Sequence, residues 1–277
     1  MPIAVDGGEP DQWLALRVAF EALADAGYAD VPPEHLRTEV ILGKGTYVNR
    51  GNLTVGYHAM IVEHFLQALR KLHPEYTDSE IGEIKKELKG GLPPFNADTA
   101  PALIGNIIAG RVANRLDLMG PSFTVDAACA SALLAIEIGI RDLLSGKSDL
   151  VLAGGANVNA PLPTMNLFCQ LGALSHNERI RPFDKNADGT ILGEGIGMIV
   201  LKRRADAERD GNRIYAIIKG VGVASDGRAL HVMAPRVEGE ELALRRAYDM
   251  AGFAPQTVGL IEAHGTATPV GDVVELQ

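Results

Sequence analysis

The stretch "DLVLAGGANV", residues 149–158, constrains the fold more than any other part of the sequence. After Asp149 the run stays apolar until it reaches a Gly-Gly pair, and it contains no further charge. A short, continuous apolar run bounded by turn residues is typical of a buried strand. The sequence therefore predicts a strand here that ends in a glycine turn.

Further strand-like runs recur along the chain, and amphipathic helix-like runs separate them. The expected strands cover residues 39–48, 122–128, 195–204, 213–226 and 258–268. The expected helices cover residues 13–26, 57–72, 78–89, 101–116 and 239–252, and one more follows Cys129 and ends near Gly146. Strands that alternate with helices predict an α/β fold, with a parallel or mixed sheet and helices on both faces.

Composition narrows the classes of protein to which the chain can belong. Its 277 residues allow one large domain or two small ones, and its formal net charge of -9 argues against a general nucleic-acid binder. Two cysteines are too few for a disulfide framework, so a reducing, cytoplasmic compartment is expected. The N-terminus shows no signal-peptide pattern, and no uncharged apolar run reaches about 18 residues, so no membrane partner is expected.

Cys129 lies where an expected strand gives way to an expected helix, in "TVDAACASALLAIEIGIRDLL", residues 124–144. A helix N-terminus carries a partial positive charge and free N–H groups, which lower the pKa of a thiol and make it a better nucleophile. Ala127, Ala128 and Ala130 leave room for an incoming acyl group. The alternative is an inert core cysteine, because free cysteine is among the most buried residue types. This stretch alone does not decide between the two.

A second polar position follows the last expected strand. In "EAHGTATPVGD", residues 262–272, His264 ends an apolar run and opens a loop of glycine and threonine. Ligands of open α/β sheets bind beyond the carboxyl ends of strands, where both Cys129 and His264 are expected. His264 is therefore a candidate acid, base or hydrogen-bond donor, although a lone histidine is more often structural.

Three blocks of sequence carry a family resemblance. They are "VDAACASALLAIEIGIRDLLSGKSDLVLAGGANV", "RPFDKNADGTILGEGIGMIVLKR" and "IEAHGTATPVGDVVE". In this order they resemble the β-ketoacyl synthases, the condensing enzymes of fatty-acid, polyunsaturated-fatty-acid and polyketide synthesis. The resemblance runs from about residue 11 to the C-terminus. It implies a thiolase-like α-β-α-β-α fold that dimerises, of which this chain holds the N-terminal half (about residues 1–205) and the start of the C-terminal half (about 206–277).

The resemblance also implies roles for individual residues. Cys129 would accept an acyl group from the phosphopantetheine of an acyl carrier protein, supplied in cis or in trans, and its backbone N–H would be one oxyanion donor. His264 would hydrogen-bond the malonyl thioester carbonyl and stabilise the enolate formed on loss of CO₂. Glu275 matches a supporting carboxylate. The family needs no directly bound cofactor or metal.

Some positions depart from the family pattern. Ala132 stands where serine is common, and Ala267 stands where glycine or serine is common. The second catalytic histidine, a lysine and a glycine-rich loop of the family would lie beyond Gln277, so the chain is expected to be an incomplete, inactive piece of a ketosynthase domain. The length and charge of residues 46–100 favour a multidomain polyketide or polyunsaturated-fatty-acid synthase as its source.

Several alternatives remain. Within the resemblance they are a thiolase-like acyltransferase and an inactive chain-length-factor-like or structural partner, although such partners typically lack the cysteine that is retained here. The "DKNADG" of residues 184–189 resembles the opening of a calcium loop, but a tight turn is favoured. The "GEGIG" of residues 193–197 leads into a strand and not a helix, which argues against a dinucleotide site. Cys169 is expected in the core, and the charged run 202–213 on a solvated turn or helix.

Overall fold

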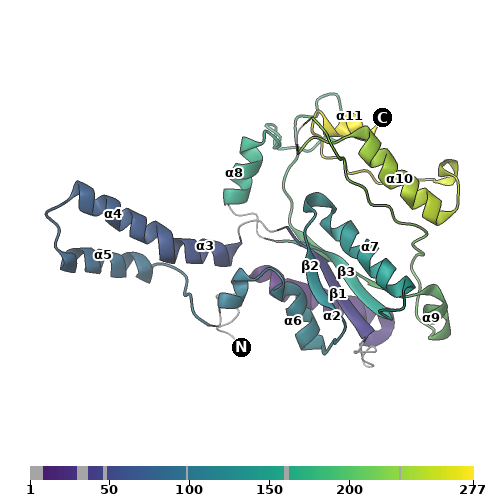
Figure 1. Ribbon diagram of the computed structural model, residues 1–277, viewed down its shortest axis with the longest axis horizontal. Helices are drawn as coiled ribbons and strands as arrows, with labels where there is room; N and C mark the ends of the chain where they lie inside the picture. The colour runs from purple at the N-terminus through teal and green to yellow at the C-terminus, as the bar shows by residue number, and fades with distance from the viewer. Residues whose placement is uncertain (1–8, 30–36, 46–48, 98, 159–161, 231) are drawn as a thin grey trace.

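A four-stranded mixed sheet forms the centre of the protein (Figure 1). The structure is a computed structural model, and it describes residues 9–29, 37–45, 49–97, 99–158, 162–230 and 232–277. The strands are β1 (Thr38–Gly43), β2 (Ser122–Val125), β3 (Leu150–Asn157) and β4 (Gly195–Leu201). They lie in the order β2-β1-β3-β4; β1 is parallel to both of its neighbours, and β4 is antiparallel to β3. The predicted α/β fold with a mixed sheet is confirmed.

Helices cover both faces of this sheet, as the sequence predicted. Helices α2 (Pro10–Leu23) and α6 (Ile107–Leu116) pack on one face, where they meet Val40, Leu42 and Leu152. Helix α7 (Ser131–Leu144) packs on the other face, where it meets Ile41 and Val151. Because successive side chains of a strand point to opposite faces, β3 must be apolar along most of its length, and so must β1 from Val40 to Leu42. This double burial explains the uninterrupted run without polar side chains between Asp149 and Asn157.

The expected helices of the N-terminal part form, with shifted ends. Helix α2 continues into a π-helical turn, η1 (Ala24–Tyr28), and stops as predicted around Gly27, whose φ is 92°. The helix expected over residues 101–116 begins only at Ile107. The residues before it form a 3₁₀ turn, η4 (Ala100–Leu103), followed by extended backbone at Ile104.

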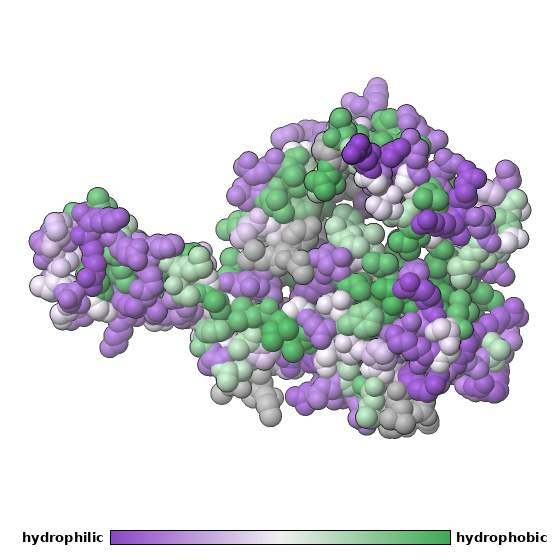
Figure 2. All heavy atoms as spheres, viewed as in Figure 1, coloured by the Kyte–Doolittle hydropathy of each residue, from purple (hydrophilic) through white to green (hydrophobic). Residues whose placement is uncertain are grey.

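A helical arm projects from the sheet (Figure 1). It comprises α3 (Arg50–Gly56), the π-helical turn η3 (Tyr57–Ile61), α4 (Val62–Leu72) and α5 (Asp78–Gly90). Thr77 and Glu80 form a capping box at the start of α5, which begins at Asp78 as expected. The small core of the arm consists of Val62, Leu66 and Ile81. The face of the arm seen in Figure 2 is mainly hydrophilic.

The C-terminal part corrects two strand predictions. It contains α8 (Leu162–Gln170), α9 (Arg204–Arg209), α10 (Val237–Ala251), η6 (Pro255–Thr257) and α11 (Gly271–Glu275). Neither 213–226 nor 258–268 is a strand, because no described segment forms a hydrogen-bonded ladder with either one. The first of them lies directly on α10: a Cβ at Gly220 or Gly222 would collide with carbonyl oxygens of that helix.

Other predictions for this part have mixed outcomes. Cys169 lies exposed on α8, so the expectation of a core cysteine is wrong. The charged run 202–213 contains the short helix α9, and its arginines form ion pairs with Asp206 and Asp210 at the surface. No described helix is long and apolar enough to cross a membrane.

Candidate active site

Cys129 lies in a tight turn between β2 and α7. The strand ends at Val125, and a 3₁₀ turn, η5 (Ala128–Ala130), carries the cysteine immediately before α7 begins at Ser131. The sequence placed Cys129 at the helix start; it lies in the turn that leads into that helix. Ala128 has a φ of 49°, a conformation uncommon for any residue except glycine. The backbone next to the thiol is therefore strained, a feature found disproportionately at functional sites.

Short hydrogen bonds hold this turn. The Oγ of Ser131 accepts a hydrogen bond from the N–H of Ala127 at 2.8 Å and donates one to the carbonyl oxygen of Ala128 at 2.6 Å. The N–H of Ala128 donates to Oδ1 of Asp126 at 3.0 Å. Sequence reasoning missed both side chains, although a serine that opens a helix is a usual backbone acceptor. The side chains of Ser131 and Asp126 offset the strain at Ala128, because they pair the N–H groups of Ala127 and Ala128 and the carbonyl oxygen of Ala128.

Two glycines let the first turn of α7 approach the sheet. A Cβ at Gly43, the last residue of β1, would collide with the backbone of Ser131. A Cβ at Gly155, near the end of β3, would lie 2.7 Å from the Cβ of Ala132. The small side chain of Ala132, which departs from the family pattern, therefore packs where little room exists. The turn that carries Cys129 lies beyond the carboxyl ends of parallel strands, as expected from the sequence.

His264 reaches the same place from the C-terminal part of the chain. Its own N–H donates to Oε1 of Glu275, and the N–H of Gly265 donates to Oε2 of the same carboxylate at 2.9 Å. Glu275 lies at the end of α11, so this short helix supports the backbone of the histidine loop. The structure thus places Glu275 on the backbone of His264, and the mutual pKa shifts of Cys129 and His264 show that their side chains lie close together.

The side chains of Cys129 and His264 perturb one another. A side-chain hydrogen bond with His264 lowers the pKa of Cys129, and it outweighs the burial that would raise that pKa. The same hydrogen bond raises the pKa of His264, with smaller contributions from the charges of Glu275 and Glu240. A lowered thiol pKa beside a raised imidazole pKa favours a thiolate–imidazolium pair. Such a pair provides a nucleophile near neutral pH.

A second carboxylate on α11 also holds the histidine loop. The Oδ1 of Asp272 accepts from the N–H of Ala267 at 2.9 Å, and its Oδ2 accepts from the N–H of Phe183 at 2.5 Å. Sequence reasoning missed Asp272. The sequence feature that could have identified Asp272 is its spacing to Glu275, since carboxylates three residues apart lie on one side of a helix.

Residues 184–189 form the favoured turn. The N–H of Ala187 donates to the carbonyl oxygen of Asp184, and Asp188 accepts from Ser175, His176 and Asn177. Among the described residues, no group of three or more histidine, cysteine, aspartate or glutamate side chains could hold a metal ion. The "GEGIG" stretch leads into β4, as predicted, and not into a helix.

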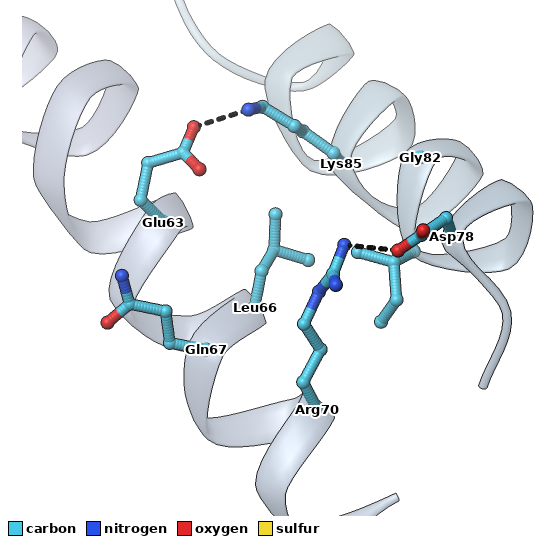
Figure 3. A pocket seen from close by; sticks show the side chains of 8 residues that line it. Glu63, Leu66, Gln67, Arg70, Asp78, Gly82 and Lys85 are labelled. Atoms are coloured by element: carbon cyan, nitrogen blue, oxygen red, sulfur yellow. Dashed lines mark ion pairs between the residues drawn. The ribbon is translucent and has the colours of Figure 1, made fainter. Parts of the chain in front are cut away.

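A pocket of about 300 Å³ lies on the arm between α4 and α5 (Figure 3). Leu66 and Ile81 line it, and ion pairs cross it between Glu63 and Lys85 (2.6 Å) and between Arg70 and Asp78 (2.9 Å). Neither Cys129 nor His264 lines this pocket, so it is separate from the site described above.

Comparison with known proteins identifies the family. The model of the β-ketoacyl synthase N-terminal domain matches residues 6–207, and the model of the C-terminal domain matches residues 215–277. The chain is 36% identical over 272 residues to a polyunsaturated fatty acid synthase of Thraustochytrium sp.. It is 37% identical over 268 residues to 6-methylsalicylic acid synthase of Aspergillus terreus. These alignments cover 98% and 97% of this chain but only 10% and 13% of the relatives.

Solved ketosynthase structures have the same fold. The ketosynthase from module 6 of the bacillaene synthase of Bacillus subtilis superposes with a TM-score of 0.76 at 27% identity. The oxazolomycin ketosynthase domain of Streptomyces albus superposes with a TM-score of 0.76 at 26% identity. Each match covers all of this chain and 41% of the other, so the chain spans less than half of these structures. The fold, the sequence pattern and the family models agree along the length of the chain. The chain belongs to the β-ketoacyl synthase family.

Proposed function

We propose that Cys129 and His264 are catalytic residues of a β-ketoacyl synthase, which condenses an acyl thioester with a malonyl unit by decarboxylation. The observation that carries this proposal is that the side chains of Cys129 and His264, from two sequence blocks far apart in the chain, act on one another: the pKa of the thiol is lowered and that of the imidazole is raised. The ketosynthase relatives support the reaction class.

In the first half of the reaction, the thiolate of Cys129 attacks the carbonyl carbon of an acyl thioester. The N–H of Cys129 donates to the oxyanion that forms, and the alanines beside the cysteine leave space for the acyl chain. The intermediate collapses to the acyl-cysteine thioester, and the carrier thiolate leaves. The imidazolium of His264 is the nearby proton source for that leaving group.

In the second half, His264 acquires a new role because acylation removes the charge of its partner. Its ring N–H is then available to the carbonyl oxygen of a malonyl thioester. Loss of CO₂ leaves an enolate, which this hydrogen bond stabilises. The enolate carbon attacks the acyl-cysteine carbonyl, and the thiolate of Cys129 leaves. Glu275 contributes by holding the backbone of His264 and Gly265 in place.

We also propose the partners of this site. The acyl and malonyl groups would arrive on the phosphopantetheine of an acyl carrier protein, so the ketosynthase itself binds no cofactor directly. The relatives are a polyunsaturated fatty acid synthase and polyketide synthases of which the chain covers 10–13%, which supports a multidomain parent enzyme. A homodimer is what the family resemblance implies. Two free thiols fit a reducing compartment such as the cytoplasm.

Acyl transfer to the protein tests this proposal directly. The complete ketosynthase domain that contains this chain is incubated with an acyl thioester of phosphopantetheine, and peptide mapping by mass spectrometry locates the added acyl mass. We expect the acyl group on Cys129, with no loading in Cys129→Ala and nearly full loading in Cys169→Ala. Because both cysteines are exposed, Cys169 is a matched control for accessibility. Acylation that follows Cys169, or that is equal at both thiols, refutes the assignment.

A further inference from the structure

Glu39 is a fully buried carboxylate at the start of the central sheet. It lies in β1 opposite Val151, and its side chain points to the sheet face that α7 covers, as that of Ile41 does two residues later. Glutamate is almost never fully buried unless it is paired. The proposed reaction does not use Glu39, because Cys129 lies beyond the opposite end of β1.

The two carboxylate oxygens of Glu39 have unequal surroundings. Its Oε2 accepts a hydrogen bond from Oγ of Ser148 at 2.8 Å. Its Oε1 has no hydrogen-bond partner among the described residues, and the ammonium group of Lys147 lies 3.9 Å from it. A buried polar atom without a partner costs free energy, and a buried charge costs more. The ionised form of Glu39 is therefore poorly satisfied in this structure.

Lys147 lies between Glu39 and a second carboxylate, Asp142 of α7. Its ammonium group donates a hydrogen bond to Oδ2 of Asp142 and remains farther from Glu39. One ammonium group therefore serves two carboxylates and pairs closely with only one of them. A neutral Glu39 leaves this pairing undisturbed, whereas an ionised Glu39 attracts the same ammonium group from a buried position.

The surroundings favour the neutral form of Glu39. Burial is the main cause that raises the pKa of Glu39, and the negative charge of Asp142 raises it further. The hydrogen bond from Ser148 and the charge of Lys147 lower that pKa, but they do not offset the increase. Glu39 therefore keeps its proton to a higher pH than an ordinary glutamate does, and the protonated carboxyl gains a hydrogen-bond donor that the carboxylate lacks.

The partners of Glu39 all come from the far end of α7. Asp142 belongs to the last turn of that helix, and Lys147 and Ser148 lie in the turn that follows it. The N–H groups of Lys147 and Ser148 both donate to the carbonyl oxygen of Asp142, at 3.0 and 3.2 Å. The opposite end of α7 follows the Cys129 turn, so Glu39 acts on the helix that leads away from the candidate nucleophile.

Arginines hold the same end of α7 at its carbonyl groups. Arg203 donates to the carbonyl oxygens of Leu143 and Ser148, at 2.8 Å each, and pairs with Asp149. Because arginine is not deprotonated in proteins, its contacts with the carbonyl oxygens do not change with pH. Two further charged groups near the cluster are Arg37, which pairs with Asp149, and Arg141, which acts on Lys147.

We propose that Glu39 is a proton-operated lock, which fastens the far end of α7 to β1 while it is neutral and loosens that end when it ionises. As Glu39 releases its proton to water, the buried negative charge draws the ammonium group of Lys147 away from Asp142, and the turn of residues 145–148 has to rearrange. The inference does not rest on the proposed reaction, because none of these groups contributes to the pKa shifts of Cys129 or His264.

Glu39→Gln in the complete ketosynthase domain that contains this chain tests the lock. Glutamine has nearly the same shape, carries no charge at any pH, and offers an NH₂ donor beside its acceptor oxygen, so it mimics the neutral carboxyl. The readout is Tm as a function of pH, measured for the wild type and for E39Q under the same conditions. The comparison isolates Glu39, because every other titratable group remains in both proteins.

We expect the Tm of E39Q minus that of the wild type to grow by at least about 2 °C between about pH 4.5 and about pH 7.5. The folded protein holds the proton of Glu39 to a higher pH than the unfolded chain does. The wild type therefore loses stability as the pH rises from the ordinary pKa of about 4.3 to the raised one, and E39Q does not. A difference that stays constant over this range overturns the proposal.

Glu137→Gln is the matched control. It removes a carboxylate from the same helix, but that side chain is 19% exposed and pairs at 3.5 Å with Arg141, which is mostly exposed. The Tm difference between E137Q and the wild type should stay constant within about 1 °C across the same range. A pH slope equal to that of E39Q would reveal a general effect of charge and would also refute the lock.

Hydrogen exchange on the wild type locates the effect, and it decides the matter if E39Q does not fold. The protection factors of the amides of Lys147 and Ser148 should fall at least about threefold over the same rise in pH, because the turn that contains them is loosened. The internal control is the amide of Leu118, which donates to the carbonyl oxygen of Ala113 at the end of α6 and should keep its protection. Unchanged protection at Lys147 and Ser148 would show that ionisation of Glu39 leaves the end of α7 in place.

Discussion

The sheet region and the C-terminal region of this protein are held together in different ways. In the sheet region, β1 and β3 bury side chains on both faces, and hydrophobic packing sets the position of α7 and of the Cys129 turn. In the C-terminal region, segments 213–226 and 258–268 run without ladders, and residues such as Leu260 (83% exposed) and Ile261 remain at the surface. There the two carboxylates of α11 set the position of His264.

This comparison teaches that the two members of the candidate site depend on different forces. Cys129 is held by nonpolar contacts that act on a whole helix, together with the hydrogen bonds of its turn. His264 is held by hydrogen bonds to ionised groups, which are directional and few. Packing defects should therefore act mainly on the first residue and loss of a carboxylate mainly on the second.

The largest expected effect tests the packing side of the comparison. Leu152→Ala removes a fully buried side chain from β3 and should lower the free energy of unfolding by about 2–5 kcal/mol. Leu260→Ala, at an exposed position, should change it by less than about 0.5 kcal/mol. Urea unfolding followed by circular dichroism measures both. Equal losses would mean that the C-terminal segment is packed as tightly as the sheet.

An intermediate effect is expected when the contact between the two regions is removed. His264→Ala should raise the pKa of Cys129 toward about 8.5 and slow its alkylation at about pH 6.5 by about tenfold or more. The pair stabilises the fold between the two pKa values. This contribution is lost as the pH falls through the lowered pKa of Cys129, and as the pH rises through the raised pKa of His264.

The control for this effect is His64→Ala, which removes an exposed histidine from the arm. Its alkylation profile should coincide with that of the wild type in a Cys169→Ala background. An unchanged midpoint in H264A would show that the two regions do not meet through these side chains.

The smallest expected effect sharpens the comparison at the level of the backbone. Ala267→Gly replaces a residue with φ of 59° by one that adopts this conformation freely, and it should raise stability by up to about 1 kcal/mol. Ala153→Gly, in the middle of β3, should do the opposite, because it weakens a strand and removes a buried methyl group. The difference in Tm between the two variants measures the contrast, and a destabilised A267G would argue that Ala267 is not strained.

Much of the sheet region could be predicted from the sequence. Continuous apolar runs predicted β1 and β3, and the helix-like run of residues 78–89 predicted α5. These features are local, since a few neighbouring residues decide the preferred backbone. Cys129 and His264 were also recognisable, because each ends a strand-like run in a polar or small-residue loop.

Only the tertiary structure decided the remaining features. Segments 213–226 and 258–268 have the apolar pattern of strands, but a strand also requires hydrogen bonds to a neighbour, and periodicity says nothing about that neighbour. The exposure of Cys169 depends likewise on what packs over α8.

The sequence by itself determined the elements of the sheet, the family pattern and the two residues of the candidate site. The tertiary structure decided that Cys129 and His264 lie close enough to shift one another's pKa, and that Asp272 and Glu275 both support the histidine loop. The physical reason is the distance along the chain over which each interaction acts. Helix signals and apolar runs act over a few residues, whereas a backbone N–H and the carboxylate that accepts it become neighbours only when the whole chain has folded.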